Sequence, residues 1–156
     1  MTCYLRRVFA GMASGVMKLI IATLDDAIHA LNHFHSFHDS VIKTLSLISH
    51  DTIESDSTVL CTGEIDVILD LLFYDLDRSD SLHGKVIRAT FKKATDINID
   101  FRGFKLTDWG ISRIDITNGS SSSFILNISW NKCDEEKKWI VLSSRLFTFK
   151  SAVIEC

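Results

Sequence analysis

Apolar positions recur first with the period of a helix and later with the period of strands. From residue 24 to residue 35 they follow spacings of three and four, at Leu24, Ala27, Ile28, Leu31 and Phe34. This spacing predicts one amphipathic helix over residues 24–35. Thr23 is expected to cap its N-terminus, and Asp25 and Asp26 lie in the first turn, where the helix dipole favours negative charge.

After His38 the period changes to two, which is typical of half-buried strands. The alternation predicts strands over residues 41–49, 59–76, 85–93, 96–101, 111–117 and 124–131. Residues 139–142 and 145–154 then form either one bent strand or two short ones. The polar insert at 118–123 lies between two alternating runs and predicts a hairpin. The apolar run at 17–22 is either a first strand or the entry to the helix.

These strands follow one another through short polar turns, which predicts antiparallel pairing rather than parallel β-α-β units. We therefore expect an α+β fold. It is a curved, half-barrel-like antiparallel sheet of about seven strands, with one main helix near the N-terminus packed on it. With 156 residues the chain suits one domain over residues 17–156, preceded by a flexible extension over 1–16. Translation from Met17 and a targeting peptide are the alternatives for that extension.

Composition narrows the classes of protein. A hydrophobic content of 46% with 24% charged residues fits a folded domain that does not cross a membrane. The net charge of −3 argues against general nucleic-acid binding. The scattered cysteines form no C-x-x-C pair and suit reduced thiols in the cytoplasm: Cys3, Cys61, Cys133 and Cys156.

Three of the six histidines lie within residues 33–40. Imidazole and carboxylate groups suit zinc or iron, so the candidate metal ligands are His33, His35, His38 and Asp39. No recognised ligand spacing such as H-E-x-x-H is present. The alternative, which we favour, is that these are exposed residues of the helix and the turn after it, with no cofactor.

His38, Asp39 and Ser40 also contain the residue types of a nucleophilic site. Such a site needs these groups to converge in space, which sequence adjacency rarely provides, and no G-x-S-x-G elbow is present. We expect instead that the three residues shape the junction between helix and strand. They remain the first candidates for a binding site.

Two further sets are candidates for binding. Trp109, between Asp108 and Gly110, is expected to be partly exposed, and exposed tryptophans are favoured binding anchors. An acidic set suits acid–base chemistry, a divalent cation, a basic partner or simply the solvated face of a strand: Glu64, Asp66, Asp70, Asp75, Asp77 and Asp80.

In residues 31–42 a short helix, the motif F-H-D-S and an alternating strand follow one another. This stretch resembles small bacterial α+β domains of largely uncharacterised function, some of which are grouped with the immunity proteins of polymorphic toxin systems. The resemblance implies a compact domain that binds a partner protein and has no catalytic activity. Phe37 would then lie in the core, and His38, Asp39 and Ser40 would fix the turn.

The sequence thus favours a non-enzymatic, cytoplasmic binding domain, of the immunity type by resemblance, whose partner is another protein. One alternative is a metal-dependent enzyme that uses the cluster from His33 to Asp39. The other is a structural module that forms a homodimer or larger oligomer through its sheet edges.

Overall fold

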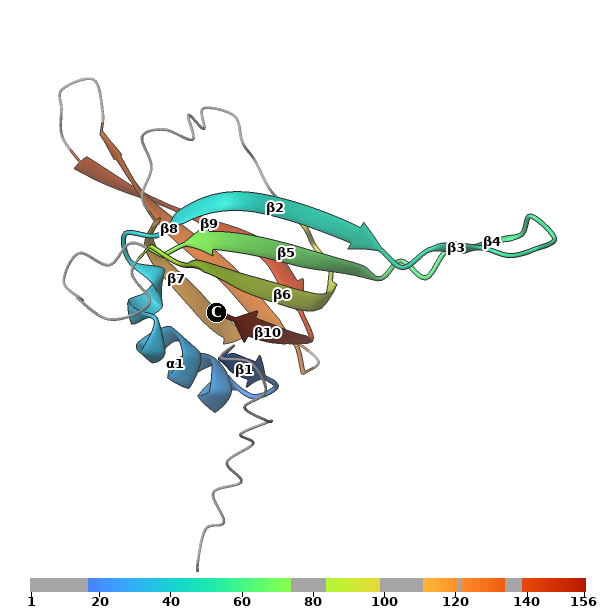
Figure 1. Ribbon diagram of the computed structural model, residues 1–156, viewed down its shortest axis with the longest axis horizontal. Coiled ribbons are helices and arrows are strands. Elements are labelled where there is room, and N and C mark those ends of the chain that lie inside the picture. The colour runs from blue at the N-terminus through green and yellow to red at the C-terminus, as the bar shows by residue number, and fades with distance from the viewer. Residues whose placement is uncertain (1–16, 74–83, 99–110, 121, 134–138) are drawn as a thin grey trace, which may run out of the picture.

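The computed structural model describes residues 17–73, 84–98, 111–120, 122–133 and 139–156 (Figure 1). In these ranges the chain forms one α-helix, α1 (Leu24–His33), and a short 3-10 turn (His35–Phe37). The strands are β1 (Lys18–Ile21), β2 (Val41–Ser49), β3 (Thr52–Ile53), β4 (Val59–Leu60), β5 (Ile65–Leu72), β6 (Val86–Ala94), β7 (Ile111–Asn118), β8 (Phe124–Cys133), β9 (Trp139–Phe149) and β10 (Ser151–Glu155).

All pairs among these strands are antiparallel, and they form two open sheets and a separate hairpin. The larger sheet has the order β1-β10-β6-β5-β2, the smaller has the order β7-β8-β9, and β3 pairs only with β4. The predicted α+β class with antiparallel strands is confirmed. The prediction of one half-barrel-like sheet with about seven strands is not confirmed, because the strands divide between two sheets and a hairpin.

The two sheets meet where the chain passes from β9 to β10. Thr95 and Thr148 exchange backbone hydrogen bonds of 2.8 and 2.9 Å, which ties the end of β6 to the end of β9. Beside this corner, the ring of Phe91 meets those of Phe147 and Phe149 edge-on, with centroids 5.1 and 5.0 Å apart. The core therefore lies between the sheets, on the face to which the alternating apolar residues of each strand point.

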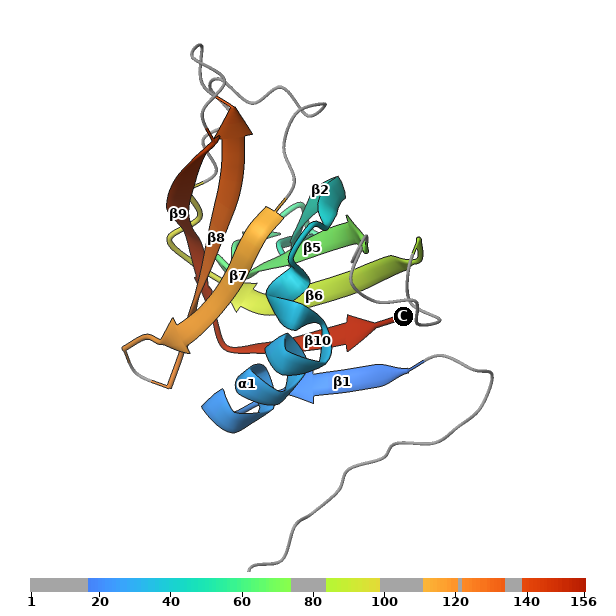
Figure 2. The same cartoon turned by 90° about the vertical axis from the view of Figure 1, so that its left-hand side faces the viewer.

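Helix α1 lies alongside β7 of one sheet and β1 of the other (Figure 2). The predicted cap is confirmed: Asp26 N donates to the Thr23 side chain, and the Asp26 carboxylate accepts from Thr23 N. The helix buries Ala27, Ala30 and Leu31, whereas Ile28, which we expected in the core, is exposed.

Two stretches differ from the predicted strands. The run predicted over 59–76 divides into β4 and β5, because Gly63 between them has φ of +64° and turns the chain. Asp96 has φ of +51°, which is incompatible with a strand, so the predicted strand over 96–101 does not begin there. Ile97 and Asn98 belong to no strand either, whereas residues 99–101 of the predicted strand and the extension over 1–16 lie outside the described residues.

Candidate functional site

The junction between α1 and β2 is a left-handed turn built without glycine. The φ angle is +45° at His35, +53° at Ser36 and +56° at Phe37, and it is positive again at Asp39. This backbone region costs an ordinary residue about 1–2 kcal/mol relative to the right-handed region. The helix therefore ends at His33, two residues earlier than predicted, and the surrounding structure has to hold the turn.

Aromatic packing supplies part of that support. The ring of Phe37 stacks on the ring of Phe34 with centroids 4.9 Å apart, and Phe34 meets Phe73 edge-on at 6.1 Å. All three side chains are buried. Because burial of Phe37 requires this backbone path, the gain from packing offsets the strain of the turn. The expectation that Phe37 lies in the core is confirmed.

Backbone hydrogen bonds supply the rest. Asp39 N donates to the carbonyl of Ile111 at 2.8 Å, and Ile111 N donates to the carbonyl of Ser40 at 2.8 Å. Ser40 N donates to the carbonyl of Phe37 at 3.1 Å. The turn is thus docked on the start of β7 by its main chain. The side chains of His38, Asp39 and Ser40 take no part in these bonds.

These three side chains do not form a nucleophilic arrangement. His38 Nδ1 lies 2.9 Å from Asp39 Oδ2, and both side chains are partly exposed. Ser40 is 0% exposed, and its Oγ makes no hydrogen bond with the described part of the chain. The imidazole is therefore paired with a carboxylate but not with a hydroxyl that it could deprotonate.

The candidate metal ligands do not converge either. The ring of His33 packs edge-on against Phe34 with centroids 4.8 Å apart, whereas His35 is exposed and His38 pairs with Asp39. Within the described ranges, no three His, Cys, Asp or Glu side chains are placed to hold a metal ion. Trp109 lies outside the described residues.

A carboxylate that sequence reasoning placed on an exposed face is buried: Asp66 is only 3% exposed. Its Oδ2 accepts hydrogen bonds from Lys92 Nζ at 2.6 Å and from His50 Nε2 at 3.0 Å. Its Oδ1 accepts from Lys93 N at 3.1 Å. Burial raises the pKa of Asp66, but these hydrogen bonds outweigh burial, so the pKa lies below its ordinary value.

Other acidic residues of that sheet face are also paired. Arg88 binds both carboxylate oxygens of Asp70, at 2.7 and 2.9 Å, and Thr44 donates to the same group at 2.8 Å. Lys93 Nζ lies 2.7 Å from a carboxylate oxygen of Glu64. The described part of the acidic stripe, predicted as a possible binding surface, is therefore a row of ion pairs with basic side chains of β6. Its other members lie outside the described residues: Asp75, Asp77 and Asp80.

The hairpin of β3 and β4 extends far from the rest of the molecule (Figure 1). We call residues 50–63 the arm. Its large apolar side chains are exposed: Ile53 by 76%, Val59 by 59% and Leu60 by 52%. Such side chains gathered on a protrusion, with no core to pack on, are typical of an interaction surface. The strands predicted over 41–49 and 59–76 leave residues 50–58 in no predicted element, although turn residues between Ile53 and Val59 are compatible with a hairpin.

Polar groups hold the arm at its base and tip. At the base, Asp51 Oδ1 accepts from Thr62 N at 2.8 Å, and His50 N donates to the carbonyl of Glu64 at 3.0 Å. At the tip, Asp56 Oδ1 accepts from Thr58 N at 2.8 Å. The arm thus has a defined shape that does not depend on burying its apolar side chains.

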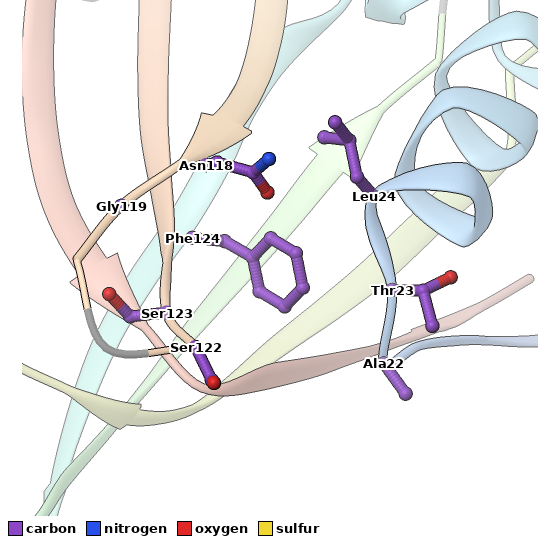
Figure 3. A pocket seen from close by; sticks show the side chains of 8 residues that line it. All are labelled: Ala22, Thr23, Leu24, Asn118, Gly119, Ser122, Ser123 and Phe124. Atoms are coloured by element: carbon purple, nitrogen blue, oxygen red, sulfur yellow. The ribbon is translucent and has the colours of Figure 1, made fainter.

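One surface cavity of about 360 Å³ lies between the N-terminus of α1 and the turn that joins β7 to β8 (Figure 3). No charged side chain lines it, and the Thr23 hydroxyl there already caps the helix. The Ser123 hydroxyl donates to the carbonyl of Ser120. The lining is Ala22, Thr23, Leu24, Asn118, Gly119, Ser122, Ser123 and Phe124. The lining includes no carboxylate, histidine, lysine or cysteine that could act as a general base beside these hydroxyls.

Comparison of the chain with known protein families, with characterised proteins and with solved structures finds no match. The described helices include none that is long and apolar enough to cross a membrane. Any proposal about function therefore rests on the geometry of the arm and of the turn.

Proposed function

We propose that the protein is a non-enzymatic, cytoplasmic binding domain that acts through contact with another protein, as immunity-type proteins do. The observation that carries this proposal is the arm, with its exposed Ile53, Val59 and Leu60. Large apolar side chains on a protrusion lower the free energy of a complex when a partner removes them from water. Among the described residues these three side chains are not part of the hydrophobic core, so the packing of the core does not explain them.

The polar clusters support the same proposal. Their members satisfy one another: Asp66 with Lys92 and His50, and Asp39 with His38. Acid–base or nucleophilic chemistry needs groups within reach of each other and of a substrate in a cleft. None of these pairs lines the cavity beside the N-terminus of α1, and the lining of that cavity carries no charge.

Purification of the full chain from the cells that make it, followed by size-exclusion chromatography, tests the proposal. We expect a stoichiometric complex with another protein. Elemental analysis of the purified chain tests the alternative of a metal-dependent enzyme. The proposal would be overturned if the chain formed no complex and contained stoichiometric zinc, iron or manganese that is lost in His38→Ala. A chain that turns over a substrate without any partner would overturn it as well.

Self-association through β2 is a second candidate. Among the described strands β2 pairs only with β5, so its other edge has no partner there, and Leu47 and Ile48 near its end are exposed. A long edge with exposed apolar residues favours pairing with another chain. Light scattering distinguishes the two candidates. A dimer that Leu47→Lys converts to a monomer would favour self-association, and a monomer at all concentrations would exclude it.

A further inference from the structure

We propose that the arm inserts into an apolar cleft, with a rim of lysine and arginine side chains, on the surface of the partner protein. This inference rests on the proposed function, and it specifies the surface and the chemistry of the partner. It follows from two properties of the arm: where its apolar side chains point, and which charges accompany them.

The apolar side chains occupy both faces of the hairpin. Ile53 lies directly opposite Val59 in the register of β3 and β4, so these two side chains share one face. Leu60 is paired with Thr52, and since neighbouring residues of a strand point to opposite faces, Leu60 lies on the other. A flat partner surface would leave one face in water. A cleft with two walls covers both.

The charges of the arm have one sign. Residues 50–63 contain Asp51, Glu54 and Asp56, all exposed, and neither lysine nor arginine. Hydrogen bonds from Ser49 and Thr62 lower the pKa of Asp51, and hydrogen bonds from Thr58 lower the pKa of Asp56. Both carboxylates are therefore charged at neutral pH, and a basic rim complements them.

The same reasoning argues against a second copy of the chain as the partner. Two arms side by side would bring like charges together without a compensating cation from either arm. The nearest cations on the sheet are already engaged, since Lys92 pairs with Asp66 and Lys93 pairs with Glu64. The charge pattern thus selects a different protein with a basic surface.

Two synthetic peptides serve as probes: one alternates valine with lysine, and the other alternates valine with glutamate. Each is titrated into the isotope-labelled full chain, and amide resonances are followed by NMR. We expect the lysine peptide to shift resonances of β3 and β4 and not those around Ile28, with an affinity that falls as salt increases. The glutamate peptide should leave the arm unchanged. Equal shifts of the β3 and β4 resonances with both peptides would overturn the proposal that the partner's cleft has a basic rim.

Three variants locate the contact. Ile53→Ser with Val59→Ser should weaken binding of the lysine peptide at least about tenfold. Glu54→Gln with Asp56→Asn keeps the hydrogen-bond acceptors and should weaken binding mainly at low salt. This variant tests the charges of the arm even if the serine variant disturbs the hairpin. Ile28→Ser, which replaces an exposed isoleucine of α1 by serine, is the matched control. Binding that survives both arm changes would overturn the inference.

The two proposals fail separately. If the arm variants bind the lysine peptide as the wild type does, while the chain still forms a stoichiometric complex with a cellular protein, only the further inference is wrong. If the full chain forms no such complex, the proposed function is wrong, whatever the peptides do.

Discussion

The turn at residues 34–40 and the arm at residues 50–63 use apolar side chains in opposite ways. In the turn, Phe34 and Phe37 are buried, and their packing holds a backbone path that ordinary residues avoid. In the arm, Ile53 and Val59 face each other but stay in water, and hydrogen bonds at the base and tip give the hairpin its shape.

This difference separates structural residues from residues available for function. The turn holds most of the histidines that suggested chemistry, yet its strain and burial serve the junction between helix and strand. The arm holds few residues that suggest chemistry. It exposes apolar area that contributes nothing to the fold, and this area is free to stabilise a complex.

Among variants that distinguish the turn from the arm, Phe37→Ala should have the largest effect. It removes a buried ring that holds the strained turn, and it should lower the free energy of unfolding by about 3–5 kcal/mol. Ile53→Ala in the arm should change it by less than about 0.5 kcal/mol. Urea denaturation of both variants measures the difference. Similar losses would show that the arm is part of the cooperative fold.

Asp66→Asn should have the next largest effect. It removes the carboxylate charge that pairs with Lys92, and it should cost about 1.5–3 kcal/mol of stability at neutral pH. Asp25→Asn, at an exposed position in the first turn of α1, is the control and should cost less than about 1 kcal/mol, since it removes only the interaction with the helix dipole. A neutral result for Asp66→Asn would mean that the cost of burying the ion pair cancels its attraction.

The same pair predicts a pH dependence. The folded pKa of Asp66 lies below its ordinary value of 3.8, so its contribution to stability is complete above that pH. The contribution is lost as the pH falls through the lower folded pKa. The stability of wild type should therefore fall more steeply with acid than that of Asp66→Asn. Parallel acid unfolding curves would contradict this assignment.

Ser36→Gly should have a smaller, stabilising effect. Ser36 has φ of +53° and ψ of +26°, a conformation that glycine adopts without steric cost. We expect a gain of about 0.5–1 kcal/mol in thermal unfolding, after the greater freedom of glycine in the unfolded chain is subtracted. Ser36→Ala is the control and should bring no gain. An equal gain from alanine would mean that the serine side chain, rather than the backbone, is unfavourable.

The smallest effect is expected for His38→Ala. The imidazole pairs with Asp39 where both side chains are partly exposed, and such pairs contribute about 0–1 kcal/mol. Differential scanning calorimetry should show almost no change in Tm. A loss as large as that of Phe37→Ala would give this histidine a structural role that its exposure does not suggest.

Local patterns predicted the regular elements well. The helix cap followed from Thr23 and Asp26, and the hairpin of β7 and β8 followed from two alternating runs around a polar insert. These features depend on neighbours in sequence, so the sequence contains them. The split of the strands into two sheets depends on the corner at Thr95 and Thr148, which only the folded chain brings together.

The sites were harder to predict for the same reason. Left-handed backbone at His35 and Phe37 has no sequence signature, because only glycine favours it. The burial of Asp66 depends on Lys92 and His50 from other parts of the chain, so a period of two wrongly placed it in solvent. The arm escaped notice because its strands contain only two residues each, too few for alternation to be visible.

The central claim is that the arm, and not the turn, binds the partner. Its most direct test is the affinity of the full chain for the protein recovered with it from cells, measured by calorimetry for two double variants. Ile53→Ser with Val59→Ser should weaken binding at least about tenfold, whereas His38→Ala with Asp39→Asn should leave it unchanged. The opposite result, with binding lost in the turn variant and kept in the arm variant, would contradict the claim.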